Sequence, residues 1–556
     1  MNNNQTYLLL ALILVLGLSL RLAPIITTQG TLREPDSYYY LSILKQSSGL
    51  KLPQISSLDN VVPAEALGLY EIALIPHVLT GISIYNIMLF SAPIWGIIAC
   101  LLTFILADQI FSNKKLALIA TFLVAVLPAG LSLTTGGSWR GDSFISVFAL
   151  LSLIFLVQTL KSSSRTKKVI YSIISALAIS LAALSWSGGL YVAGVYLLAT
   201  LELGVLYIII KRDQIKNIIY PILTLILFAG EFLALQHIGW IYKSVTYPPT
   251  TVTTRIISNA NIQETLPPTA GYVVATFGFL AVLGPAIFLG LSSYPAIATL
   301  IMTIVMVVIY AAISSRGKPK EVYTKDALLI APLFSYLIVT FYLNALEVRF
   351  VSLSAFSIAI FMAYFIYYIL EFTKPFQKIV VPFIIIIVLF SGAVFVYGYR
   401  PANDITPSFI STLNWLKANT PSNATVVATW PDASEVEGLS TRFSYADSVS
   451  SSPYQASVSQ WFVTNESLPQ FIPKPNYILL RGVIFNESVA LCEIAGINTS
   501  YCSKLNNTMF LNNTKPNFYV LWKSCNMSPC HIIEGNTTYF LEYFENDTKI
   551  YLIDMR

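Results

Sequence analysis

The chain has 556 residues, of which 55% are hydrophobic and only 11% are charged. A soluble globular protein carries about 25% charged residues, so this composition excludes a chain that is soluble throughout. The net charge is +5, but the basic residues form short clusters between apolar stretches, which argues against a nucleic-acid-binding protein.

Runs of apolar residues long enough to cross a bilayer recur from residue 6 to residue 399. We predict a transmembrane domain over residues 1–400 and a polytopic α-helical membrane protein with about 11–13 spans. An inside amino terminus with an outside tail requires an odd number of spans. Residues 271–313 must therefore cross the membrane once or three times, although they contain two apolar segments, one of which could be interfacial or re-entrant. The predicted segments are Thr6–Ile26, 83–111, 115–134, 143–160, 168–186, 188–210, 216–236, 271–291, 294–313, 326–345, 349–370 and 378–399.

Lysine and arginine mark the loops on one side of the membrane. By the positive-inside rule these loops are cytoplasmic, which makes the segments between them external. The predicted external loops, 27–82 and 237–270, together with the loop before residue 143, hold Asp36, Glu264 and Asp142. The basic clusters are Lys114–Lys115, Lys161–Lys168, Lys211–Lys216, Arg316–Lys325, and Lys374 with Lys378.

From residue 401 to residue 556 the chain is rich in Asn, Ser, Thr and Pro, and long apolar runs stop. We predict a mixed α/β extracellular domain here. Pro407–Asn419 reads as an amphipathic helix with Phe409, Leu413 and Leu416 on one face. Strands are predicted from the alternation of apolar residues between turn formers. They are Thr425–Thr429, Tyr477–Leu480, Phe518–Trp522, Tyr539–Phe544 and Ile550–Ile553.

Two further features of the tail indicate export. Sequons mark surface loops of exported domains, and an even number of cysteines in such a domain fits two disulfides, with three possible pairings. The sequons begin at Asn423, Asn465, Asn486, Asn498, Asn506, Asn512, Asn526, Asn536 and Asn546. The cysteines are Cys492, Cys502, Cys525 and Cys530.

Isolated acids stand in the external loops. Asp36 taken alone favours an ordinary solvated loop acid over a site residue. Asp142, where a helix begins, fits either an N-terminal cap or a catalytic acid. Together with Glu264, these carboxylates could converge on one divalent cation, and oxygen ligands suit Mn²⁺ or Mg²⁺.

Arg349 borders an apolar segment at its predicted external end. An arginine there either extends its charged head to the lipid headgroups or clamps a phosphate. In the tail, Trp430-Pro431-Asp432 is weak evidence as a tripeptide. Because it follows a membrane domain with acidic residues in its external loops, it indicates an aromatic and acidic surface that binds a polypeptide.

The order of these motifs resembles the catalytic subunit of oligosaccharyltransferase, especially its archaeal single-subunit form. Arg33–Tyr40 is similar to the family's first acidic motif and Gly137–Asp142 to the second. Ser185–Gly189 resembles a structural Trp-Gly element, and Asn261–Glu264 resembles the T-I-x-E motif. Trp430–Ser434 resembles the W-W-D-Y-G signature.

The resemblance implies a C-type glycosyltransferase membrane fold on the cell membrane with its active site outside. It implies transfer of a preassembled glycan from a dolichyl phosphate or pyrophosphate to the Asn amide of N-x-S/T, and leaves open any additional subunits. Asp36, Asp142 and Glu264 would be catalytic and hold the metal. Arg349 would meet the lipid-linked phosphate. Trp430 and Asp432 would bind the hydroxyl of the acceptor sequon.

The sequence also departs from the family pattern. Arg140 stands where the second acidic motif offers another metal-binding position, and Pro431 replaces the second Trp of the signature. Ala433-Ser434 replaces Tyr-Gly, whereas Arg442 and Asp447 follow at the family's spacing. We find no convincing copy of the family's Asp-Lys motif.

Two alternatives remain from the sequence. A mannosyl- or aminoarabinosyl-type transferase that uses a single-sugar polyprenyl phosphate shares the acidic first loop, but not the Asn-Ile-Gln-Glu and Trp-Pro-Asp elements. A transporter with a glycosylated ectodomain would line a path with polar residues inside its spans.

Overall fold

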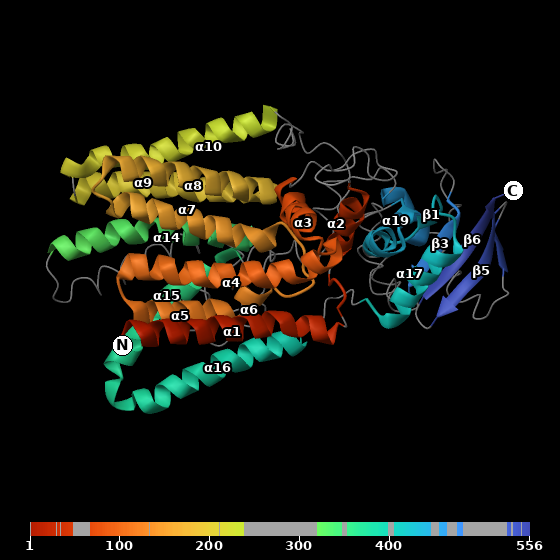
Figure 1. Cartoon of the computed structure of the whole chain (residues 1–556), viewed down its shortest axis with the longest axis horizontal. Coiled ribbons are helices and arrows are strands. Elements are labelled where there is room, and N and C mark those ends of the chain that lie inside the picture. The colour runs from red at the N-terminus through yellow and green to blue at the C-terminus, as the bar shows by residue number, and fades with distance from the viewer. Residues whose placement is uncertain are drawn as a thin grey trace, which may run out of the picture.

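The computed structural model has a helical bundle at one end and a β-sheet at the other, with two short helices between them (Figure 1). The amino terminus lies at the end of the bundle that is far from the sheet. This is the predicted polytopic membrane domain followed by a mixed α/β tail. The structure describes residues 2–28, 30–33, 35–47, 67–132, 134–210, 212–237, 320–346, 353–398, 405–445, 455–463, 475–481, 531–534, 537–545 and 548–555.

Within these ranges, seven helices are long and apolar enough to cross a membrane by length and composition. The predicted segments that fall on described residues are largely helical, and 271–291 and 294–313 lie outside them. The seven are α1 (Asn3–Thr27), α4 (Ile84–Phe111), α7 (Asp142–Lys161), α8 (Arg165–Ser185), α9 (Tyr191–Ile210), α10 (Ile219–His237) and α16 (Gln377–Gly398). Further bundle helices are α5 (Lys114–Val126), α6 (Pro128–Leu131), α14 (Lys320–Leu346) and α15 (Ala355–Phe372).

The predicted segment 115–134 is not one helix, because it breaks between α5 and α6 at Pro128. Proline has no N–H to donate to the carbonyl four residues earlier, which here belongs to Val124. The Nη2 of Arg21 donates to that carbonyl at 3.2 Å, and its Nη1 donates to the carbonyl of Ala125 at 2.9 Å. A side chain of α1 therefore satisfies the backbone groups that the break exposes.

Arg21 uses its whole guanidinium in this way. Its other donors bond the carbonyls of Gly17 and Gly130 and the hydroxyl of Thr134. A guanidinium has five N–H donors, and five hydrogen bonds are formed. Since unsatisfied polar groups are costly inside a membrane, this buried cation links α1 to the α5–α6 break.

We expect Arg21→Met to lower the Tm of the purified protein by on the order of 5 °C, because several buried carbonyls lose their donor. Thermal unfolding in detergent measures this shift. The matched control is Arg165→Met, which removes an exposed arginine at the start of α8 and should leave the Tm unchanged. An equal Tm for the Arg21 variant and the wild type would contradict the role of this link.

Two intramembrane glutamates each bond a serine on a neighbouring helix. Glu231 on α10 accepts from Ser180 on α8 at 2.6 Å, and Glu202 on α9 accepts from Ser335 on α14 at 2.8 Å. Polar side chains inside a membrane normally find such partners. Each pair therefore joins two helices of the bundle.

The segment 27–82, which the sequence predicts only as an external loop, contains two helices among its described residues. They are α2 (Pro35–Gln46) and α3 (Leu67–Thr80), and both lie between the bundle and the tail (Figure 1). Tyr38, Tyr39 and Tyr40 are buried in α2. Hydropathy does not reveal such a helix, because it is too short to cross a bilayer and is buried by contacts with distant segments.

The described residues of the tail form a six-stranded sheet in the order β2-β1-β3-β6-β5-β4. β1 pairs in parallel with β2 and β3, and the other pairs are antiparallel. Four predicted strands are confirmed, β2 and β4 are additional, and 518–522 lies outside the described residues. The elements are α17 (Pro407–Asn419), β1 (Thr425–Val427), α18 (Trp430–Glu435), the π-helical turn η9 (Val436–Ser440), β2 (Phe443–Ser444), α19 (Gln455–Val463), β3 (Tyr477–Arg481), β4 (His531–Glu534), β5 (Thr537–Glu545) and β6 (Thr548–Met555).

Helix α17 has the predicted bounds and covers this sheet with the predicted face. Phe409, Leu413 and Leu416 are buried and pack with Val426 of β1 and Leu479 of β3. Thr406 caps the helix through a hydrogen bond from the backbone N–H of Phe409 to its Oγ1. This cap fixes the first turn of α17, where Phe409 stands.

Candidate functional site

Asp36 lies in the first turn of α2, where a negative charge is favoured by the helix dipole, and its side chain is half-buried. The next residue, Ser37, accepts a hydrogen bond from the backbone N–H of Trp139 at 2.9 Å. Just before α2, the N–H of Arg33 donates to the carbonyl of Gly137 at 3.0 Å. The loops that carry the two acidic motifs therefore lie side by side.

The second loop is held by close backbone approaches at its glycines. Gly137 has a φ of +84°, which favours glycine, and its N–H donates to the carbonyl of Leu89 at 3.0 Å. At Gly141, a Cβ would collide with the backbone oxygen of Ser185 and with Trp186. The predicted Trp-Gly element therefore packs directly against the residue that precedes Asp142.

Asp142 is the first residue of α7 and is 4% exposed. Gly141 occupies the N-cap position, so Asp142 is not itself the N-cap residue, but it stands in the first turn of α7, where the helix dipole favours an acid. The Oδ2 of Asp142 lies 3.4 Å from the Nη2 of Arg140. The residue that departs from the family's acidic position thus partly neutralises the acid that remains.

Asp36 and Asp142 are the two predicted metal ligands that the structure describes, and each stands at the start of a helix, α2 and α7 respectively, directly after one of the two adjacent loops. Their oxygen donors suit a hard cation such as Mn²⁺ or Mg²⁺. No cluster of three or more His, Cys, Asp or Glu suited to a metal occurs within the described ranges, and the third predicted ligand, Glu264, lies outside them. The donor chemistry therefore fits a divalent cation in part.

The Trp-Pro-Asp motif forms the start of α18. Thr429 is the N-cap, Trp430 begins the helix, and Pro431 stands in the first turn. Proline is tolerated there because the first N–H groups of a helix have no intrahelical partner. Pro431, a departure from the family signature, is therefore compatible with a helix at this position.

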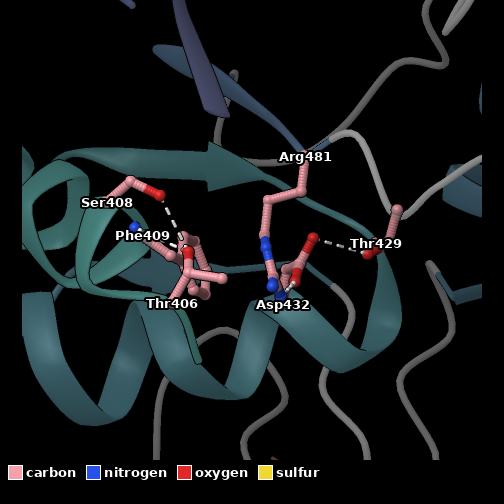
Figure 2. Close-up of polar contacts among 6 residues, drawn as sticks. All are labelled: Thr406, Ser408, Phe409, Thr429, Asp432 and Arg481. Carbon is pink, nitrogen blue, oxygen red and sulfur yellow. Dashed lines mark hydrogen bonds and ion pairs between the residues drawn. The ribbon is translucent and has the colours of Figure 1, made fainter. Parts of the chain in front are cut away.

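Asp432 stands in this same first turn and forms a buried ion pair, which Figure 2 shows. Its Oδ1 lies 2.8 Å from the Nη1 of Arg481, and its Oδ2 accepts from the Oγ1 of Thr429 at 3.1 Å. Asp432 and Arg481 are each 1% exposed. The guanidinium of Arg481 lies 4.2 Å from the ring centroid of Phe409.

Helix α18 and the turn η9 pack against α2, the helix that carries Asp36. The Nζ of Lys45 on α2 donates to the carbonyl of Gly438 at 2.6 Å. A Cβ on Gly438 would lie 2.6 Å from the backbone oxygen of Tyr38. The acidic helix of the membrane domain and the Trp-Pro-Asp helix of the tail therefore meet in one interface.

This interface also shifts the ionisation of its polar groups. Burial raises the pKa of Tyr38 well above its usual range, and the neighbouring Tyr85 and Glu435 add to the rise. Burial lowers the pKa of Lys45, with a smaller effect from Lys417. Both side chains bond backbone carbonyls, Tyr38 that of Leu32 and Lys45 that of Gly438, so they position the helices.

Several predicted site residues lie outside the described ranges, including Glu264, Arg349 and Asp447. The four tail cysteines and all sequons except Asn423 also lie outside them. Asn423 is exposed in the turn between α17 and β1. Arg442 is buried and donates to the carbonyls of Lys417 and Thr420, so it secures the end of α17.

Sequence reasoning missed Arg481, Gly438 and Ser37. The signal for Arg481 is a basic residue at the end of the apolar run Tyr477–Leu480, which the sequence predicts as a strand. An ionised residue next to a buried strand usually has a partner. Gly438 and Ser37 have no such signal, because their contacts join segments that are distant in sequence.

Two solved structures with a similar arrangement come from the archaeon Archaeoglobus fulgidus. AglB of Archaeoglobus fulgidus, an oligosaccharyltransferase solved with an inhibitory peptide and a dolichol-phosphate, aligns with a TM-score of 0.67 and 13% identity over 90% of this chain and 72% of that one. The Archaeoglobus fulgidus oligosaccharyltransferase tethered to an acceptor peptide with an NVT sequon aligns with a TM-score of 0.65 and 14% identity, with the same coverage. The class defined by the fold is a polytopic membrane domain of the oligosaccharyltransferase kind with a mixed α/β tail.

The family is shown by sequence. The profile described as "Oligosaccharyl transferase STT3, N-terminal" matches residues 63–400, which is more than half of the chain. The chain belongs to the oligosaccharyl transferase STT3 family.

Two curated relatives match the sequence of this chain over a shorter stretch. Dolichyl-phosphooligosaccharide-protein glycotransferase 1 of Pyrococcus horikoshii is 26% identical over 217 residues, which cover 37% of this chain and 22% of that protein. The protein of the same name from Pyrococcus furiosus is 24% identical with the same coverage. The match therefore spans less than a quarter of the length of these relatives.

Proposed function

We propose that this protein transfers a preassembled glycan from a dolichyl phosphate or pyrophosphate to the Asn amide of N-x-S/T sequons in exported polypeptides. The observation that carries the proposal is the interface between α2, which holds Asp36, and α18 with η9, which holds the Trp-Pro-Asp motif. Such an interface sets an acidic centre beside a candidate peptide-binding surface. The relatives from Pyrococcus, which are named as protein glycotransferases, support the same reaction.

The chain's own residues have separate tasks in this proposal. The amide nitrogen of Asn is a poor nucleophile because its lone pair is delocalised. Asp36 and Glu264 accept hydrogen bonds from that NH₂ group, which weakens the delocalisation. Asp36, Asp142 and Glu264 hold a Mn²⁺ or Mg²⁺ ion, which when bound stabilises the charge of the leaving phosphate. Arg349 binds that phosphate.

Trp430 and Asp432 form the acceptor pocket. Asp432 accepts a hydrogen bond from the sequon hydroxyl, and Trp430 packs against the threonine methyl group. A carboxylate has about four lone-pair positions, so two existing bonds leave capacity for a hydroxyl. Because Asp432 is 1% exposed, contact requires movement of the residues that cover it.

The orientation of the site follows from the basic clusters. The active site and the tail lie on the extracellular face, and the nine sequons of the tail are substrates for the protein's own reaction. Asn423 supports this proposal, because it is exposed.

The test is transfer to a fluorescent peptide by the full-length protein. The reaction contains an N-x-T peptide, a lipid extract with dolichyl-linked glycans, and Mn²⁺ or Mg²⁺. We expect a mobility shift for this peptide and no shift for its Gln-x-T counterpart. Attachment of a single sugar to a hydroxyl group would instead favour the polyprenyl-phosphate alternative.

Removal of divalent cations is expected to stop this reaction. Incubation with EDTA should abolish the mobility shift, and Mn²⁺ or Mg²⁺ added in excess should restore it, because the cation stabilises the leaving phosphate. The measurement is the initial rate against free cation concentration. Full activity in EDTA would contradict the metal assignment without excluding transfer itself.

A further inference from the structure

We propose that Arg481 is a positioning residue for acceptor recognition, which acts through Asp432 and does not touch the peptide. The inference rests on the proposed function and deepens it. Arg481 ends β3, in the middle of the tail sheet, whereas Asp432 is on α18, the helix that faces α2. The ion pair between them is a direct link from the rigid sheet to the candidate acceptor surface.

The Asp432 carboxylate is held from two sides. Arg481 binds Oδ1 at 2.8 Å, and Thr429, the N-cap residue of the same helix, binds Oδ2 at 3.1 Å (Figure 2). One partner comes from the sheet and the other from the helix itself, so rotation of the carboxylate would break at least one bond. A hydroxyl that binds Asp432 therefore meets oxygen atoms with a fixed direction.

Arg481 is itself fixed by α17. Its guanidinium lies over the ring of Phe409, and a cation over an aromatic face is attracted by the ring's quadrupole. Phe409 stands in the first turn of α17, whose start is capped by Thr406. A chain of contacts thus runs from the cap of α17 through Phe409 and Arg481 to Asp432.

An arginine suits this task better than a lysine. Its planar fork can stack on a ring while one N–H bonds a carboxylate, whereas an ammonium is a compact point charge. Groups that orient a metal ligand by hydrogen bonds typically change metal affinity or activity about 10- to 100-fold when they are removed, and we apply the same scale to a contact one step removed from the peptide. We therefore expect Arg481→Met to raise the peptide KM by about 10- to 100-fold.

The experiment compares three variants of the full-length protein. Arg481→Met should raise the peptide KM while the donor KM stays within about twofold, and Arg481→Lys should give an intermediate peptide KM. Leu479→Ala truncates a buried residue of the same strand and lowers stability without removing a bond to Asp432. If Leu479→Ala lowers the Tm by the same amount as Arg481→Met and raises the peptide KM by the same factor, Arg481 acts through stability alone and the inference is wrong.

A second measurement does not depend on activity. Hydrogen exchange of the amides in Trp430–Glu435 should become at least about tenfold faster in Arg481→Met, because α18 loses its link to the sheet. In Leu479→Ala the exchange rates of these amides should change by the same factor as those of the other amides in the tail. If exchange in α18 is unchanged in Arg481→Met, the inference is wrong, whether or not the wild type transfers glycan. A wild type that transfers no glycan would instead refute the proposed function.

Discussion

Asp36→Asn is expected to lower the rate of transfer to a sequon peptide by about 10³-fold or more. The substitution removes the negative charge that binds the cation and orients the acceptor amide. It keeps the shape of the side chain. The hydrogen bond from the backbone N–H of Trp139 to the Oγ of Ser37 does not involve the side chain of Asp36, so it should remain. The measurement is kcat at saturating peptide and donor, with the Tm as a check on folding.

The matched control for this prediction is Glu71→Gln. Glu71 lies on α3, the other short helix between the bundle and the tail (Figure 1), and this substitution also converts a carboxylate to an amide. We expect its rate to stay within about twofold of the wild type, because it has no role in the proposed chemistry. Retention of more than a tenth of the activity by Asp36→Asn, or its recovery in excess Mn²⁺, would refute the role of this carboxylate.

The sequence predicts those parts of the fold that depend on local composition. A membrane-spanning helix needs only an apolar run of sufficient length, so α4, α7, α8 and α16 follow from hydropathy. Helix α17 follows from its 3.6-residue period and from Thr406-Pro407, a cap followed by a proline. Strands β3, β5 and β6 follow in the same way from short apolar runs.

Contacts between distant segments are not predictable in this way. Arg21 bonds residues more than 100 positions away, Arg481 meets Asp432 across 49 positions, and Lys45 meets Gly438 across 393. Each contact depends on the packed fold rather than on neighbouring residues. The sequence therefore identifies the acidic loops and the Trp-Pro-Asp motif, but not the interface that joins them.

Pro431 illustrates the difference between a motif and its structure. In the W-W-D-Y-G signature the second position is Trp, and Pro431 replaces it. As a residue in the first turn of α18, it occupies one of the few helical positions where proline is tolerated. Helix α18 has only six residues, too few for a periodic pattern, so its existence depends on packing against α2 and η9.

The second large effect is expected at Gly438, where the tail contacts the membrane domain. An added Cβ would lie 2.6 Å from the backbone oxygen of Tyr38 and 2.9 Å from its Cβ. The oxygen is a backbone atom of a buried helix, so it cannot move aside as the end of a flexible side chain would. Gly438→Val must therefore displace η9 from α2 and strain the bond between Lys45 and the carbonyl of residue 438.

This displacement separates the two halves of the proposed site. Asp36 precedes Tyr38 by two residues on α2, and α18 leads directly into η9. A misplacement of about 1 Å at a reacting centre can lower a rate about 10²-fold, so we expect kcat/KM for the peptide to fall by about that factor. Gly438→Ala, with less added volume, should lose less activity.

The control for added volume is Gly194→Val on α9, where a new Cβ meets no described atom within 4 Å. We expect this variant to keep its kcat/KM within about threefold, since a β-branched residue costs helix stability only slightly. Hydrogen exchange in Tyr38–Lys45 should rise in Gly438→Val and not in Gly194→Val. If Gly438→Val transfers glycan at the wild-type rate, the contact between α2 and η9 is not needed for the reaction, and the two parts of the site act without this interface.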